Sequence, residues 1–151
     1  MLKQSDSEVS MTMSYAESRT LYGGFKTVAL WVCAASYISV GINHFTDPDL
    51  FVLIVPAYLP EPLLLVHISG VAEVLGGIGL LFRKTRRAAA WGILALLVAV
   101  YPANINMLVN DIYLPDMAKE RWILWARMPL QFVFAGWVIW VAGLWPRRST
   151  S

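Results

Sequence analysis

The stretch LLLVHISGVAEVLGGIGLLF, Leu63 to Phe82, is 20 residues long and holds a single carboxylate. A helix of that length rises about 30 Å, which matches the hydrocarbon core of a membrane. The basic sequence RKTRR, Arg83 to Arg87, follows at once and ends the apolar run. We therefore expect Leu63–Phe82 to be a transmembrane helix.

Three further apolar runs lie on either side of this one: residues 27–45, 88–109 and 128–145. Continuous runs of this kind differ from the alternating strands, about 10 residues long, of a membrane barrel. The whole chain is 58% hydrophobic and 15% charged, whereas a soluble domain has about 45–50% apolar and about 25% charged residues. The sequence predicts an all-α membrane protein, a four-transmembrane-helix bundle formed by residues 27–145.

The basic residues are distributed unevenly around the predicted spans. Nine of the 12 belong to the N-terminal tail, the Arg83–Arg87 turn and the C-terminal tail, and the other three are Lys119, Arg121 and Arg127. Cytoplasmic loops of membrane proteins carry the excess of lysine and arginine. Both termini are therefore predicted to be cytoplasmic.

The segments outside the spans are predicted from their composition. Residues 1–26 are polar and are expected to form a disordered cytoplasmic tail. Residues 146–151 are expected to form a basic cytoplasmic tail. The first external loop contains LFVLIVPAYLP, residues 50–60, which is apolar but too short to cross and is interrupted by prolines. It is expected to lie in the interface or to re-enter the membrane.

Polar side chains within the spans gather toward the predicted outer face. Because polar groups in hydrocarbon are costly, each one calls for a reason. This placement predicts a polar pocket in the outer half of the bundle, open to the exoplasmic side. Its candidate ligand-binding residues are His44, Asn43, His67, Tyr101, Asn104, Asn106, Gln131 and the mid-span Trp137.

Glu73 is the candidate catalytic residue. It lies ten residues into the predicted second span, about 15 Å deep. A lone carboxylate at that depth favours its protonated form. The functional interpretation is a proton donor or acceptor for a bound ligand. The structural alternative is a neutral carboxyl group that holds helices in register through a hydrogen bond.

The sequence lacks the residues that several classes of function require. The net charge of +2 is too small to favour nucleic-acid binding. The one cysteine, Cys33, excludes thiol–disulfide exchange within the chain. No zinc spacing or phosphate loop is present. His44 and His67 could bind haem or a metal in principle, but interfacial hydrogen bonding is the favoured interpretation, so no metal site is predicted.

Five motifs together resemble the DoxX-like family of small bacterial membrane proteins. They are GINHFTDPDLF from Gly41, PAYLP from Pro56, HISGVAEVLGGIGLL from His67, YPANINM from Tyr101 and MPLQ from Met128. The resemblance extends from the first predicted span to the last.

The resemblance implies a four-helix bundle in the bacterial inner membrane. Some members of that family are linked to quinone-dependent sulfur oxidation or to membrane redox complexes, and a related eukaryotic branch acts in receptor-channel assembly. The positions matching the family pattern are Gly41, His44, Phe45, Gly70, Glu73, Pro102, Asn104, Asn106 and Gln131. The resemblance supplies no reaction, because one fold hosts many functions.

Two functions remain open from the sequence. In the first, a redox-associated subunit binds a quinone or similar lipid headgroup in the outer pocket. The chain has no redox centre of its own, so electrons would come from a membrane partner. In the second, the protein is a non-enzymatic chaperone or accessory subunit, with small-residue faces and the 50–60 segment contacting a partner or another copy. A transporter is a third option, disfavoured by four spans without an inverted repeat.

Overall fold

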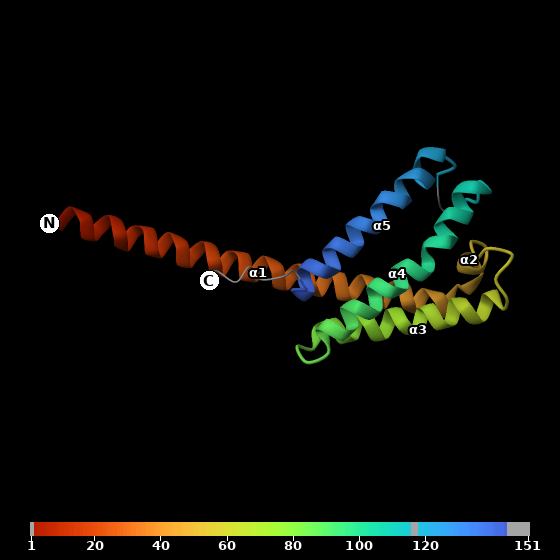
Figure 1. The fold of residues 1–151 in the computed structure, drawn as a ribbon, viewed down its shortest axis with the longest axis horizontal. Helices are drawn as coiled ribbons and strands as arrows, with labels where there is room; N and C mark the ends of the chain where they lie inside the picture. Colours follow the sequence, from red (N-terminus) through yellow and green to blue (C-terminus); the bar gives the residue numbers. More distant parts are fainter. Residues whose placement is uncertain (1, 116–117, 145–151) are drawn as a thin grey trace.

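The computed structural model describes residues 2–115 and 118–144, with side chains from Thr20 onward. The described residues form five helices joined by turns, without strands: α1 (Leu2–Thr46), α2 (Pro48–Val52), α3 (Pro62–Leu81), α4 (Arg86–Val109) and α5 (Arg121–Ala142) (Figure 1). Four helical segments are long and apolar enough to cross a membrane: Thr20–Thr46 of α1, and the whole of α3, α4 and α5. The prediction of four membrane-spanning helices is confirmed at this level of length and composition.

The N-terminal region differs from the expected disordered tail, because α1 is continuous from Leu2 to Thr46. No proline interrupts residues 2–46. An existing helix also extends more easily than a new one nucleates, since nucleation is the costly step. The apolar span therefore serves as the nucleus from which the helix continues into the polar region.

The last helix also differs in its bounds. It runs over Arg121–Ala142, whereas residues 128–145 were predicted. The prediction rests on the apolar run alone, which begins after Arg127, whereas Arg127 lies within α5. The helix ends at Gly143, whose φ of 69° is a left-handed conformation that glycine adopts without strain. Residues 145–151, including the predicted basic tail, lie outside the described residues.

Helices α1 and α3 pack at very short range, and glycines make this possible. A Cβ added to Gly70 would lie 2.7 Å from the His44 Cβ and 2.9 Å from the Gly41 carbonyl oxygen. A Cβ added to Gly77 would lie 2.8 Å from the Ala34 carbonyl oxygen. Small residues of this kind let helix backbones approach closely in membranes.

The four long helices meet in a buried cluster on the side of the α3–α4 turn, remote from α2. Its members are Leu30, Cys33 and Ala34 of α1, Leu80 of α3, Ala90 and Ile93 of α4, and Val138, Val141 and Ala142 of α5. The Trp140 indole also donates a hydrogen bond to the Tyr22 hydroxyl, 2.9 Å away. From this cluster onward α5 diverges from α1 (Figure 1).

The segment after α1 forms the short helix α2 and a run of turns, and it packs onto the chain's own helices. Ile54 is buried against Met107 of α4 and Leu124 of α5. The Asn106 amide donates to the Ile54 carbonyl oxygen at 3.1 Å. We call the end of the molecule closed by this segment the α2 end.

Candidate functional site

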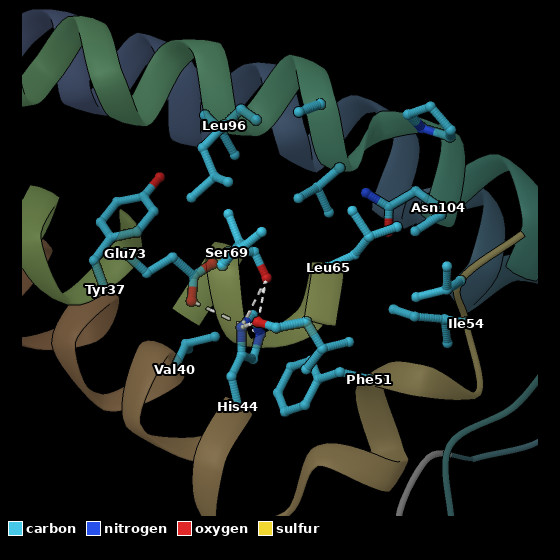
Figure 2. Close-up of a pocket in the computed structure, with 18 of the residues that line it drawn as sticks. Tyr37, Val40, His44, Phe51, Ile54, Leu65, Ser69, Glu73, Leu96 and Asn104 are labelled. Atoms are coloured by element: carbon cyan, nitrogen blue, oxygen red, sulfur yellow. Dashed lines mark hydrogen bonds and ion pairs between the residues drawn. The ribbon is translucent and has the colours of Figure 1, made fainter. Parts of the chain in front are cut away.

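A cavity of about 640 Å³ lies between the remote cluster and the α2 end. Its walls come from α1, α3, α4 and α5, and α2 with the turns that follow it supplies the cover. Most lining side chains are apolar, such as Val40, Leu96 and Phe51. Figure 2 shows Glu73 and Tyr37 on one side of this space and Asn104 with Ile54 on the other. The cavity therefore has apolar walls and two separate polar regions.

The first polar region is built around His44, which is 5% exposed. Its Nδ1 lies 3.1 Å from the Val66 carbonyl oxygen and 3.0 Å from the Ser69 hydroxyl. Ser69 Oγ donates to the same carbonyl at 2.8 Å. With the Ser69 hydrogen used there, Nδ1 is the nitrogen that carries the hydrogen in the neutral ring. The lone pair is then on Nε2, which faces Glu73 (Figure 2).

Glu73 stands beside this histidine on the cavity wall. Its Oε2 is 3.8 Å from His44 Nε2, and its side chain is 13% exposed. This oxygen is buried without a hydrogen-bond partner among the described residues. A buried polar atom of this kind calls for an explanation, because leaving it unpaired costs about 1–3 kcal/mol. The two atoms are beyond hydrogen-bond distance, so transfer of a proton between Oε2 and Nε2 requires the side chains to move closer or a water to bridge them.

The second polar region joins α4 and α5 through a chain of hydrogen bonds. The Arg127 guanidinium donates from Nε and Nη2 to Asn104 Oδ1, at 3.3 and 3.2 Å. The Asn104 amide donates to Gln131 Oε1 at 2.7 Å, and Gln131 Nε2 donates to the Leu97 carbonyl oxygen. Each amide is thereby fixed in orientation, and Arg127 is held at the cavity wall.

Four of the nine predicted site residues line the cavity: Glu73, His44, Asn104 and Trp137. Gln131 lies behind the wall, 8% exposed, and orients Asn104. The prediction thus identified residues of both polar regions.

The other four predicted residues lie outside the cavity lining and have their own packing roles. Asn43 points to the surface. His67 stacks on Phe45, with ring centroids 5.2 Å apart. The rings of Tyr101 and Phe132 pack in a T-shaped arrangement, and the Asn106 side chain holds the cover segment through its hydrogen bond to Ile54. These residues share the depth of the site but face other directions, because depth alone does not determine the face of a helix.

Ser69 and Arg127 belong to the site but were absent from the predicted binding residues. Ser69 lies four residues before Glu73, and Arg127 lies four residues before Gln131. Residues separated by four share one face of a helix. Helical spacing from Glu73 and Gln131 could therefore have found both.

Comparison with known proteins gives a family match alone. Neither the curated proteins nor the solved structures contain a match. A model of the family described as "Domain of unknown function (DUF8561)" matches residues 33–142. The match spans well over half of the chain and includes every residue that lines the cavity. This chain therefore belongs to the DUF8561 family.

Proposed function

We propose that this membrane protein binds a quinone headgroup in the cavity and exchanges a proton with it through Glu73. The observation that carries this proposal is the buried, unpartnered Glu73 Oε2 on the cavity wall, 3.8 Å from His44 Nε2. A protonated Glu73 carboxyl group would donate to a quinone carbonyl oxygen, and in the reverse direction the Nε2 lone pair of His44 would take up the proton that Glu73 receives from a quinol. Ligand sites typically combine apolar walls with a few polar groups that fix orientation.

The size and setting of the cavity support a ring-shaped ligand with an apolar tail. Its volume of about 640 Å³ lies within the usual range of about 300–1,000 Å³ for small-molecule sites. Val40 of α1 and Phe134 of α5 both line it and are 42% and 39% exposed. The cavity thus reaches the molecular surface between α1 and α5, where an isoprenoid tail would pass into the surrounding lipid.

The amount of quinone that remains bound to the protein during purification tests this proposal. Protein purified in mild detergent from native membrane is expected to contain quinone, measured by mass spectrometry of an organic extract. Glu73→Leu removes the hydrogen-bond donor at similar size and is expected to lower the quinone content about tenfold. A hydrogen bond of this kind typically contributes about 1.5 kcal/mol to binding, and its loss corresponds to about a tenfold fall in affinity.

Glu120→Leu is the matched control, because Glu120 is an exposed glutamate beyond the cavity. It should retain the full quinone content. Wild-type protein free of quinone, or equal content in Glu73→Leu and wild type, would contradict the proposal.

We further propose that the four long helices form a bundle in a bacterial inner membrane, with both termini cytoplasmic and the α2 end outside. The uneven lysine and arginine distribution supports this orientation. Of the four basic residues in the Arg83–Arg87 turn, Arg83, Lys84 and Arg87 are exposed. Arg86 instead donates from Nε to the Leu80 carbonyl oxygen at 2.7 Å and caps α3. The resemblance to DoxX-like proteins agrees with this arrangement, and we propose that relationship as well.

Cysteine labelling can check the orientation, since the native Cys33 is buried. A cysteine at Tyr58, which is 74% exposed at the α2 end, is expected to react with a membrane-impermeant maleimide on intact spheroplasts. A cysteine at Lys84 should react only after the membrane is permeabilised. The reverse pattern would place the termini outside.

Electrons for the bound quinone would come from a membrane partner, which links this proposal to the alternative role of an accessory subunit. In that alternative, residues 50–60 would contact a partner. In this structure Ile54 of this segment is buried against the chain's own α4 and α5. This packing favours a segment that covers the cavity over one that contacts a partner. Capture of a stoichiometric partner by both wild type and Glu73→Leu, without quinone in either, would favour the accessory role.

A further inference from the structure

Arg127 is the charged residue of the cavity wall that the proposed proton exchange does not use. It lies within α5, six residues after Arg121, and is half-buried. Among the described residues, its hydrogen bonds go to Asn104 Oδ1, and no carboxylate lies within ion-pair distance of it. By contrast, Arg121 of the same helix is exposed and pairs with Asp111 at 3.5 Å.

The surrounding hydrogen bonds orient this guanidinium without neutralising it. Asn104 accepts from two of its nitrogens, and Gln131 fixes Asn104 in turn. An amide oxygen supplies a dipole and no full negative charge. Charged residues in membrane-spanning helices are expensive, and they usually pair with an opposite charge or mark a functional site. The charge of Arg127 is thus presented at the cavity wall with N–H donors beyond the two used by Asn104.

We propose that Arg127 binds an anionic oxygen of the ligand, and that it makes the cavity selective for quinones that carry a negative charge. This inference rests on the proposed function for the identity of the ligand as a quinone. Asn104, which holds Arg127, lies across the cavity from Glu73 (Figure 2). The two polar regions therefore address different oxygens of one ring: Glu73 and His44 serve a neutral carbonyl, and Arg127 serves the charged oxygen. Arginine suits this task because its planar fork of donors matches an anionic oxygen group.

Two naphthoquinones of the same size provide the test. One has a ring hydroxyl that is ionised at neutral pH, and the other has a methyl group at that position and is neutral. Binding is followed in detergent by quenching of tryptophan fluorescence, because Trp137 lines the cavity. Wild-type protein is expected to bind the anionic quinone about tenfold more tightly than the neutral one.

Arg127→Gln removes the charge and retains a hydrogen-bond donor. It is expected to abolish the tenfold preference by weakening the anionic quinone alone. Arg121→Gln removes one positive charge from the same helix outside the cavity, so it should leave both affinities unchanged. Arg127→Lys keeps the charge and should keep part of the preference, which covers the case in which Arg127→Gln does not fold.

The possible failures are distinguishable. If wild type binds both quinones equally, or prefers the neutral one, the role of Arg127 is overturned while the proposed function stands. The same holds if Arg127 pairs with a lipid phosphate, since lipid then occupies the guanidinium and the preference is lost. If neither quinone binds to folded wild-type protein, the proposed function and this inference both fail.

Discussion

Replacing Glu73 with glutamine is expected to slow the reduction of a cavity-bound quinone about 100-fold while leaving its binding intact. Glutamine is close to the size of glutamate and can still donate a hydrogen bond to a carbonyl oxygen, but its amide hydrogens are not acidic and cannot be transferred. Reduction of a quinone to a quinol takes up two electrons and two protons. A positioned general acid typically contributes about 10²–10⁴-fold to such a step. The variant therefore separates holding the ligand from protonating it.

The measurement uses protein loaded with methylnaphthoquinone and mixed rapidly with dithionite, which supplies the electrons. Formation of the quinol is followed by its absorbance. Glu120→Gln is the control, because it makes the same chemical change at an exposed site, and its rate should equal that of wild type. If Glu73→Gln reduces as fast as wild type at the same occupancy, Glu73 has a packing role instead.

The second large effect is expected at the crossing of α1 and α3. Leucine at Gly70 should lower the free energy of unfolding by about 3 kcal/mol, at the upper end of the usual cost of overpacking. Even the first added carbon would lie 2.7 Å from the His44 Cβ and 2.9 Å from a backbone oxygen. The two helices would have to separate. Because His44 and Glu73 come from these two helices, quinone binding should fall with stability.

Unfolding in detergent with increasing dodecyl sulfate, followed by circular dichroism, measures this effect. Gly136→Leu is the matched control: a Cβ at Gly136 meets nothing within 4 Å, so that variant should remain near wild-type stability. Equal loss of stability in both variants would show that helix composition, and not the crossing, is responsible.

The predicted spans agree with the structure where amino-acid composition determines the bounds of a helix. Apolar length is sufficient to place α3 and α4 within two residues of their observed bounds. It does not decide where a helix ends in polar surroundings, where hydrogen-bond continuity and local conformation take over. Hence α1 extends back to Leu2, and α5 begins at Arg121 although its first turns carry two arginines.

The candidate site shows the same division. Glu73 and His44 could be identified because a polar group within an apolar span has a high cost of burial. Their pairing depends on the close approach at Gly41 and Gly70, which no single-chain pattern specifies. His67 has the same residue type and nearly the same depth as His44, but it faces Phe45. The rotation of each helix is set by packing against its neighbours, so residue type and depth do not separate these two histidines. The resemblance to DoxX-like proteins, whose pattern includes His44 and not His67, is the one sequence signal that distinguishes them.

The divergence of α5 from α1 has a consequence for ligand exchange. These helices are joined at one end by contacts such as Trp140 with Tyr22, and the cavity reaches the surface where they spread apart. In a bilayer, acyl chains would press on both sides of that opening, so its width would respond to lateral pressure and chain order. Uptake of a ligand by this route would then be governed by the state of the lipid as well as by affinity. A detergent micelle lacks that pressure profile. In a micelle the ligand would therefore enter the cavity at a different rate, even where its affinity for the protein is the same.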